Sequence, residues 1–180
     1  MKIDNFELIF YNEQHKDIKD EFIFGESSSK FINNIENRLS IKPNEDFFNH
    51  GYLVKYKDNV VAYLYVSGIT NDNIYLEYSV LNKYRNQKIA SNLINSITNY
   101  IFNNFNINEI KLNISKDNRS SQKVAENCGY YLDDEEEYLY TDKSDFVINN
   151  PYYINKKRNW CFSKYMILYL PRWNYGRKTN

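Results

Sequence analysis

The stretch Tyr84–Ala90, with the sequence YRNQKIA, joins a strand-like run directly to the start of an amphipathic helix. Backbone N–H groups at the start of a helix have no acceptor within it, and the helix dipole places positive charge behind them. Arg85 and Lys88 add two cationic side chains at the same place. The junction therefore predicts an anion site, most simply for phosphate. A basic turn before a helix is, however, more often only a solvated connection.

The residues on either side of this stretch predict a strand, a helix and a second strand. Apolar residues alternate over 74–80, follow a stripe near helical spacing over 89–105, and alternate again over 110–114. Two strands joined through a helix imply parallel pairing with a right-handed crossover. The Tyr84–Ala90 stretch thus lies at the carboxyl end of a parallel strand.

A further helix is predicted after the second of these strands. Asn118 is placed as an N-cap, and Val124, Ala125 and Cys128 supply an apolar face. Gly129 suits the left-handed position that follows a helix C-terminus. This second crossover helix is therefore expected to end at Gly129.

The remaining segments complete the predicted sheet and its covering helices. Strands are predicted at 5–10, at 52–56 and 60–66 as a hairpin, and at 130–140 and 160–170 as a closing antiparallel pair, with two short helices between 18 and 39. A long polar loop over 142–159 is expected between the closing strands, and loops of that length are often functional or mobile. The basic tail, 171–180, is expected to fray. Residues 1–180 are expected to form a single domain.

Composition and charge weigh against several classes of function. Lys and Arg total 23 and Asp and Glu total 23, so no global basic field argues for nucleic acid. The N-terminus lacks an apolar signal core and no apolar run approaches bilayer length, so a cytoplasmic protein with no membrane partner is expected. Cys128 and Cys161 lie far apart without a metal-ligand spacing, so reduced thiols and no metal site are expected.

Two motifs, one strand apart and in the same order, resemble one family of enzymes. The segment Val80–Tyr130 resembles the GNAT superfamily of N-acetyltransferases, whose turn carries the signature Arg/Gln-x-x-Gly-x-Gly/Ala. Arg85 and Ala90 match the ends of this signature, whereas Lys88 stands at its central glycine. Asn118–Tyr130 is similar to the Asn-x-x-Ser-x-x-Val-Ala-Glu-x-x-Gly-Phe segment of the ribosomal-protein and N-terminal acetyltransferase branch.

This resemblance implies a fold and a co-substrate. The fold is mixed α/β (α+β) in three layers: a mostly antiparallel sheet of about seven strands, with helices on both faces and a parallel pair, strands four and five, that splays apart. Acetyl-CoA would place its pantetheine arm in the splay and its pyrophosphate on the turn. The contacts carried over from the family fall on Val80, Leu81, Arg85, Asn86, Gln87, Lys88, Ile89, Ala90, Ser91, Asn118 and Ser121.

Lys88 is a departure from the family with a physical consequence. A glycine there permits close approach of a ligand or unusual dihedrals. Lysine adds positive charge beside the phosphate instead, and a helical backbone tolerates it if the site does not require positive φ. The backbone at residue 88 is therefore where the assignment is easiest to test.

The implied chemistry needs a base and a proton donor. An amine must lose a proton when it attacks the thioester, and the departing thiolate gains from a donor. Glu77, on the strand that leads to the turn, is the candidate base, although a salt-bridged strand glutamate is the simpler interpretation. Ala125 occupies the position of a tyrosine donor found in many family members. Ser121, matching the serine of the ribosomal-protein branch, is the candidate donor.

The sequence specifies the amine that accepts the acetyl group less closely than it specifies acetyl-CoA. The Ser121 pattern favours a protein or peptide amine, and the acidic run at 133–137, with the tyrosines at 138, 140, 152 and 153, leaves a small polycationic amine open, such as an aminoglycoside or a polyamine. A degenerate domain that only binds CoA or another protein is a further alternative. The sequence leaves both a monomer and a homodimer open.

Overall fold

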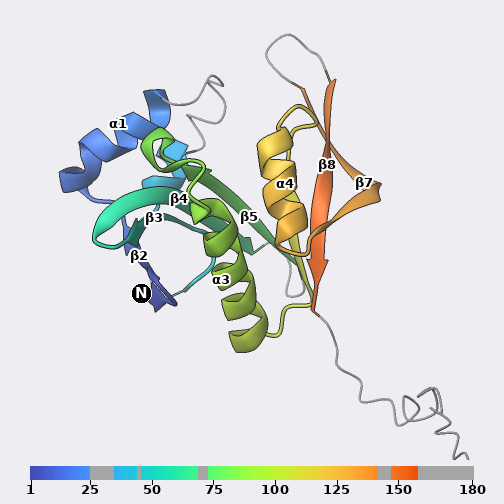
Figure 1. The fold of residues 1–180 in the computed structure, drawn as a ribbon, viewed down its shortest axis with the longest axis horizontal. Coiled ribbons are helices and arrows are strands. Elements are labelled where there is room, and N and C mark those ends of the chain that lie inside the picture. Colours follow the sequence, from blue (N-terminus) through green and yellow to red (C-terminus); the bar gives the residue numbers. More distant parts are fainter. Residues whose placement is uncertain (25–34, 44–45, 69–72, 142–146, 158–180) are drawn as a thin grey trace, which may run out of the picture.

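One mixed sheet forms the centre of the molecule (Figure 1). The computed structural model describes residues 1–24, 35–43, 46–68, 73–141 and 147–157. In the order in which they lie side by side, the strands are β1 (Lys2–Ile3), β2 (Phe6–Phe10), β3 (His50–Tyr56), β4 (Asn59–Gly68), β5 (Asn73–Val80), β6 (Glu109–Asn113), β8 (Val147–Lys156) and β7 (Tyr131–Thr141). All neighbours are antiparallel except β5 and β6, which are parallel. The predicted mixed fold with one parallel pair is confirmed, whereas the sequence pattern missed the strands β1 and β8.

Helices cover both faces of the sheet. They are α1 (Lys16–Phe24), preceded by the short η1 (Glu13–His15), then α3 (Ile89–Asn104) after the short η2 (Asn82–Tyr84), and α4 (Arg119–Asn127). Residues 35–39 form one more helical segment. Among the helices that the structure describes, none combines the length and the apolar character needed to cross a bilayer.

The alternation along β5 assigns its side chains to two cores. Ile74, Leu76 and Val80 are buried with the apolar stripe of α3, including Leu93 and Ile97. The intervening side chains lie on the opposite face, because successive strand residues point to opposite sides of a sheet. A second core forms there from residues of α1, the helical segment 35–39, β3 and β4, namely Phe22, Ile35, Leu39, Leu53 and Tyr63, together with Leu81.

The second crossover follows the prediction closely. Asn118 caps α4, and its side chain accepts a hydrogen bond from the Ser121 N–H over 3.1 Å. Gly129 follows the helix with φ of 78°, the left-handed conformation that glycine adopts without a steric cost. Tyr130 is buried beneath α4, and its hydroxyl lies 2.7 Å from that of Thr98 on α3.

The predicted closing loop at 142–159 is wrong over most of its length, because β8 occupies 147–156. The Asn149-Asn150-Pro151 sequence is typical of a turn, yet Pro151 lies in a strand between two neighbours. The ladder with β7 is irregular at this point: Tyr152 pairs with Asp133, whereas Pro151 pairs with Glu137. A bulge of this kind accommodates a proline that has no N–H to donate. The strand predicted at 160–170 and the tail 171–180 lie outside the described residues.

Gly51 allows the helical segment 35–39 to pack closely on β3. A Cβ at this position would lie 2.9 Å from both the carbonyl carbon and the carbonyl oxygen of Arg38. Backbone atoms cannot rotate away as a side-chain end can, so the helical segment would have to move. Gly51 thus determines where the side chain of Arg38 is placed.

Gly51→Ala should lower the free energy of unfolding by about 1–3 kcal/mol, the usual cost of forcing extra volume into a packed region. Chemical denaturation measures the change. Gly68→Ala is the matched control, because its Cβ would meet only side-chain atoms at ordinary contact distances, of Phe48 at 3.4 Å and of Asn49 at 3.9 Å. Equal stability of the two variants would contradict the close packing at Gly51.

Candidate functional site

The parallel pair β5–β6 separates before β5 ends. The last paired residues are Leu76 and Leu112, whereas β5 keeps pairing with β4 until Val80 faces Ala62. Residues 77–80 of β5 therefore have a strand on one side only, within the part of the chain that the structure describes. We call the region between residues 77–80 and the chain that follows Leu112 the strand opening.

The turn that follows β5 contains two residues in the left-handed conformation. Asn86 has φ of 61° and Lys88 has φ of 60°. Asparagine tolerates this conformation better than most residues, whereas lysine does not. The condition under which a helical backbone would tolerate lysine, that the site does not require positive φ, is therefore not met at residue 88. The turn has the backbone for which the family signature uses glycine, and Lys88 adopts it at a cost.

The turn leads directly into α3, and the N-cap residue of this helix provides no side-chain acceptor for the first N–H groups. Lys88 occupies the N-cap position and makes no capping hydrogen bond with its side chain. The side chains of residues 85–88 are exposed, whereas Ile89 is buried and anchors the helix. Unpaired N–H groups at the positive end of a helix of 16 residues, with two cations beside them, fit a pyrophosphate.

Several polar groups that were predicted to contact the cofactor have partners within the protein. The Nε of Arg85 donates to the carbonyl oxygen of Val80 over 3.0 Å, which ties the turn to the end of β5. The Leu81 N–H donates to the carbonyl oxygen of Val61. Gln87 donates from its side chain to the carbonyl oxygen of Lys83. These bonds shape the turn before any ligand arrives.

Asn118 acts first as a helix cap. Its side-chain oxygen accepts from the Ser121 N–H and, over 2.9 Å, from the Ser120 hydroxyl. Ser121 is half-buried in the first turn of α4, just beyond the end of β6. The cap therefore fixes the backbone from which the Ser121 hydroxyl extends.

Glu77 forms an ion pair with Arg38, and the two side chains are each about a quarter exposed. The guanidinium also lies over the ring of Tyr65, 4.1 Å from its centroid. Burial raises the pKa of Glu77, and this effect outweighs the opposing influences of Arg38 and Tyr63. A carboxylate with a raised pKa is better matched to accepting a proton near neutral pH than an exposed one.

The two predicted catalytic residues lie on opposite faces of β5. Glu77 faces Arg38 on the side of α1, whereas its neighbour Tyr78 packs against the core on the side of α3 and α4, beside Ser121. Arg38 and Tyr78 are site residues that the sequence patterns did not reveal. Arg38 lies in a helical segment without a motif, and Tyr78 follows the alternation of an ordinary core residue.

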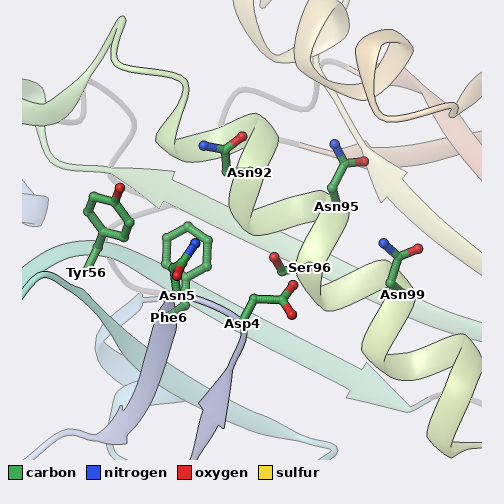
Figure 2. A pocket seen from close by; sticks show the side chains of 8 residues that line it. All are labelled: Asp4, Asn5, Phe6, Tyr56, Asn92, Asn95, Ser96 and Asn99. Carbon is green, nitrogen blue, oxygen red and sulfur yellow. The ribbon is translucent and has the colours of Figure 1, made fainter.

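An open hollow of about 660 Å³ lies away from these residues, between the β1–β2 turn and α3. Figure 2 shows Asp4 and Asn5 on one side and Asn95 and Asn99 on the other. Its polar lining includes no predicted catalytic or cofactor-binding residue. The predicted catalytic residues Glu77 and Ser121 lie at the strand opening and not at this hollow.

Comparison with known proteins identifies the family. The family model described as "Acetyltransferase (GNAT) family" matches residues 11–130, two thirds of the chain. The chain belongs to the GNAT acetyltransferase family. It is thus an acyl-CoA-dependent N-acyltransferase with acetyl-CoA as co-substrate. No curated protein sequence matched the chain.

Solved structures share the fold of this GNAT protein at low sequence identity. The microcin C7 self-immunity acetyltransferase MccE, in complex with acetyl-CoA and AMP, is 18% identical, with TM-score 0.61 and coverage of 86% of this chain and 93% of that one. A chimera of the spermidine N-acetyltransferase SpeG from Vibrio cholerae and hSSAT is 14% identical, with TM-score 0.60 and coverage of 85% of this chain and 96% of that one. A Salmonella typhimurium acetyltransferase that modifies the N-terminal serine of ribosomal protein L7/L12 is 14% identical, with TM-score 0.63 and coverage of 86% and 96%.

Lys88→Gly should raise the free energy of unfolding by about 1 kcal/mol, because it relieves a left-handed lysine while adding freedom to the unfolded chain. Asn86→Gly should change it by less, since asparagine already tolerates this conformation. Urea denaturation of both variants checks the difference. A Lys88→Gly protein less stable than the parent would show that the lysine side chain contributes more than its backbone costs.

Proposed function

We propose that this GNAT protein transfers an acetyl group from acetyl-CoA to a primary amine of a protein or peptide, by direct attack of the amine on the thioester. The observation that carries the proposal is the strand opening, with Glu77 on one face of β5 and Ser121 beside the other. An amine can approach from the first face while the thiolate departs toward the second. Neither step needs a covalent intermediate on the protein.

Binding of the co-substrate is assigned to the turn and the strand opening. The uncapped N–H groups at the start of α3 would receive the pyrophosphate, and Lys88 would add its charge. Residues 77–80 of β5 would offer backbone groups to the pantetheine arm, because β6 no longer pairs with this part of β5, and the arm would compete with Arg85 for the carbonyl oxygen of Val80. Acetyl-CoA, when bound, supplies the activated acetyl group.

Glu77 is assigned as the base. As the amine nitrogen bonds to the carbonyl carbon and the carbon–sulfur bond breaks, the amine proton passes to Glu77, directly or through a water molecule. Arg38 holds the carboxylate in place and also lowers its pKa. An incoming ammonium group would compete with Arg38 for the carboxylate, so acceptor binding and activation of the base are coupled.

Ser121 is assigned as the donor to the leaving group. Its hydroxyl would pass a proton to the CoA sulfur and recover one from water. The cap by Asn118 supports this role because it fixes the first turn of α4. Ala125 cannot supply such a proton and the Ser120 hydroxyl donates to Asn118, so Ser121 is the residue of α4 to which we assign this role.

The acceptor class rests on the Ser121 motif and on similarity. One protein of similar structure is described as modifying the N-terminal serine of a ribosomal protein, and another is described as a spermidine N-acetyltransferase. The acidic run at 133–137 would favour a polyamine. The structure does not describe the side chains of residues 134–137, nor those of Tyr138 and Tyr140. Tyr152 and Tyr153 are buried in the sheet core. A peptide amine is therefore the proposed acceptor.

Release of CoA thiol from acetyl-CoA should occur with peptides that bear a free α-amine. Ser121→Ala should lower kcat by about a hundredfold, which is the low end of the usual contribution of a general acid, and should change KM for acetyl-CoA little. Spermidine and an aminoglycoside complete the amine panel. Turnover with these amines alone would move the acceptor to the polycationic class. A protein that binds acetyl-CoA without turning over any amine would be a non-catalytic CoA-binding module.

The pH profile should reveal Glu77. Because the base acts in its ionised form, kcat/KM should fall as the pH drops through the raised pKa of Glu77, above the ordinary value of about 4.3. Arg38→Met removes an influence that lowers this pKa, so the acidic limb should move to higher pH. Glu77→Gln should abolish the limb together with most of the activity.

Lys55→Met serves as the matched control for Arg38→Met. Lys55 pairs with Glu7 on the surface, over 3.4 Å, and its loss should leave the acidic limb unchanged. An acidic limb that persists in Glu77→Gln would assign the base to another residue.

A further inference from the structure

Tyr78 packs on the side of β5 that faces α4, against the core that includes Ala125, and the Ser121 hydroxyl lies one helical turn before Ala125. Tyr78 follows Leu76, the last residue of β5 paired with β6, by two positions, so its ring points to the same face, toward α3 and α4. Ser121 belongs to the first turn of α4, on the β6 side. Tyr78 on β5 and Ser121 on α4 thus lie on either side of the region where β5 and β6 no longer pair.

The hydroxyl of Tyr78 is buried and makes no well-formed hydrogen bond within the described residues. The Ser121 hydroxyl is nevertheless near enough to lower the pKa of Tyr78, although burial raises that pKa to about 12. Burying a hydroxyl with poor hydrogen bonding lowers the stability of a protein. Among the described residues the fold tolerates this cost at the hydroxyls of Tyr63 and Tyr78, and Tyr78 lies beside the candidate proton donor.

Tyr130 provides a contrast in the same region. Its hydroxyl is also buried, and it lies 2.7 Å from the Thr98 hydroxyl within the core. The Tyr130 hydroxyl thus has a hydrogen-bond partner, whereas the Tyr78 hydroxyl has none of good geometry within the described residues. Tyr130 therefore has a structural role, which makes it the reference for Tyr78.

The protonation state of Tyr78 determines the direction of its contact with Ser121. A phenol with a pKa of about 12 keeps its proton at neutral pH. It can donate that proton in a hydrogen bond to the Ser121 oxygen. A serine hydroxyl has one proton and two lone pairs, so a serine that accepts from Tyr78 keeps its own proton for another acceptor.

We propose that Tyr78 is a positioning residue, whose phenol donates to the Ser121 hydroxyl and thereby directs the serine proton toward the thioester sulfur. This proposal rests on the proposed function of Ser121. The protein lacks a tyrosine at residue 125 of α4, and Tyr78 brings a phenol to the strand opening from β5 instead. It acts through Ser121 and does not itself meet the sulfur.

A double-mutant cycle tests the coupling. Tyr78→Phe should lower kcat about tenfold, the factor that corresponds to one hydrogen bond of ordinary strength, and leave KM for acetyl-CoA within about twofold. In a Ser121→Ala background, Tyr78→Phe should have no further effect, because there is no hydroxyl left to direct. A similar loss in both backgrounds, or no loss in the parent protein, would overturn the proposal.

Tyr130→Phe is the matched control, since it removes a buried phenol from the same core without touching Ser121. Tyr130→Phe should leave kcat within about twofold of the parent value. It should lower the melting temperature, because the buried Thr98 hydroxyl loses its hydrogen-bond partner. Tyr78→Phe should leave the melting temperature equal or higher, because it removes a poorly bonded buried group. A Tyr78→Phe protein that melts well below the parent would assign the residue to structure alone.

A measurement without turnover separates this proposal from the proposed function. In protein labelled with ¹³C at the tyrosine ζ carbons, the resonance that Tyr78→Phe removes should shift in Ser121→Ala. Thr98→Ala should shift the Tyr130 resonance instead. A Tyr78 resonance that Ser121→Ala leaves unmoved would overturn the contact. If it moves and no amine is acetylated, the contact stands and the proposed function fails.

Discussion

The early end of pairing between β5 and β6 is the constraint on which the rest of the site depends. β5 continues to Val80 because β4 still pairs with it, whereas β6 is short and the chain soon turns into α4 at Asn118. A sheet interior normally leaves no backbone edge open. Here the edge lies inside the sheet, beside a helix N-terminus, so a long thioester can meet strand, turn and helix at once.

Several of the candidate site residues have backbone conformations or buried polar groups that lower the stability of the fold. Lys88 adopts φ of 60°, Glu77 and Arg38 are partly desolvated, and the Tyr78 hydroxyl is buried without a good partner. Each feature lowers the free energy of unfolding, and each lies on β5 or is packed against it or directly follows it in the chain. Such a cost also occurs elsewhere, since Lys57 in the turn between β3 and β4 has φ of 48°.

Local patterns predict the elements that local physics determines. The stripe of α3, the cap at Asn118 and the left-handed Gly129 follow from spacing, capping and sterics, and all are confirmed. β8 was missed because Pro151 is typical of a turn, and only the irregular ladder with β7 makes it acceptable in a strand. Arg38 was missed because its importance comes from Gly51, which sets how closely its helical segment approaches the sheet.

Sequence alone establishes the family, the co-substrate and the order of the elements, because two motifs at a fixed spacing specify a strand, a phosphate-binding turn and a capped helix. The tertiary structure decides which face each reacting group occupies. Glu77 and Tyr78 are neighbours in the chain, yet one meets Arg38 and the other meets Ser121. The strand pleat separates them, and only packing against two different helical layers gives each its partner and its pKa.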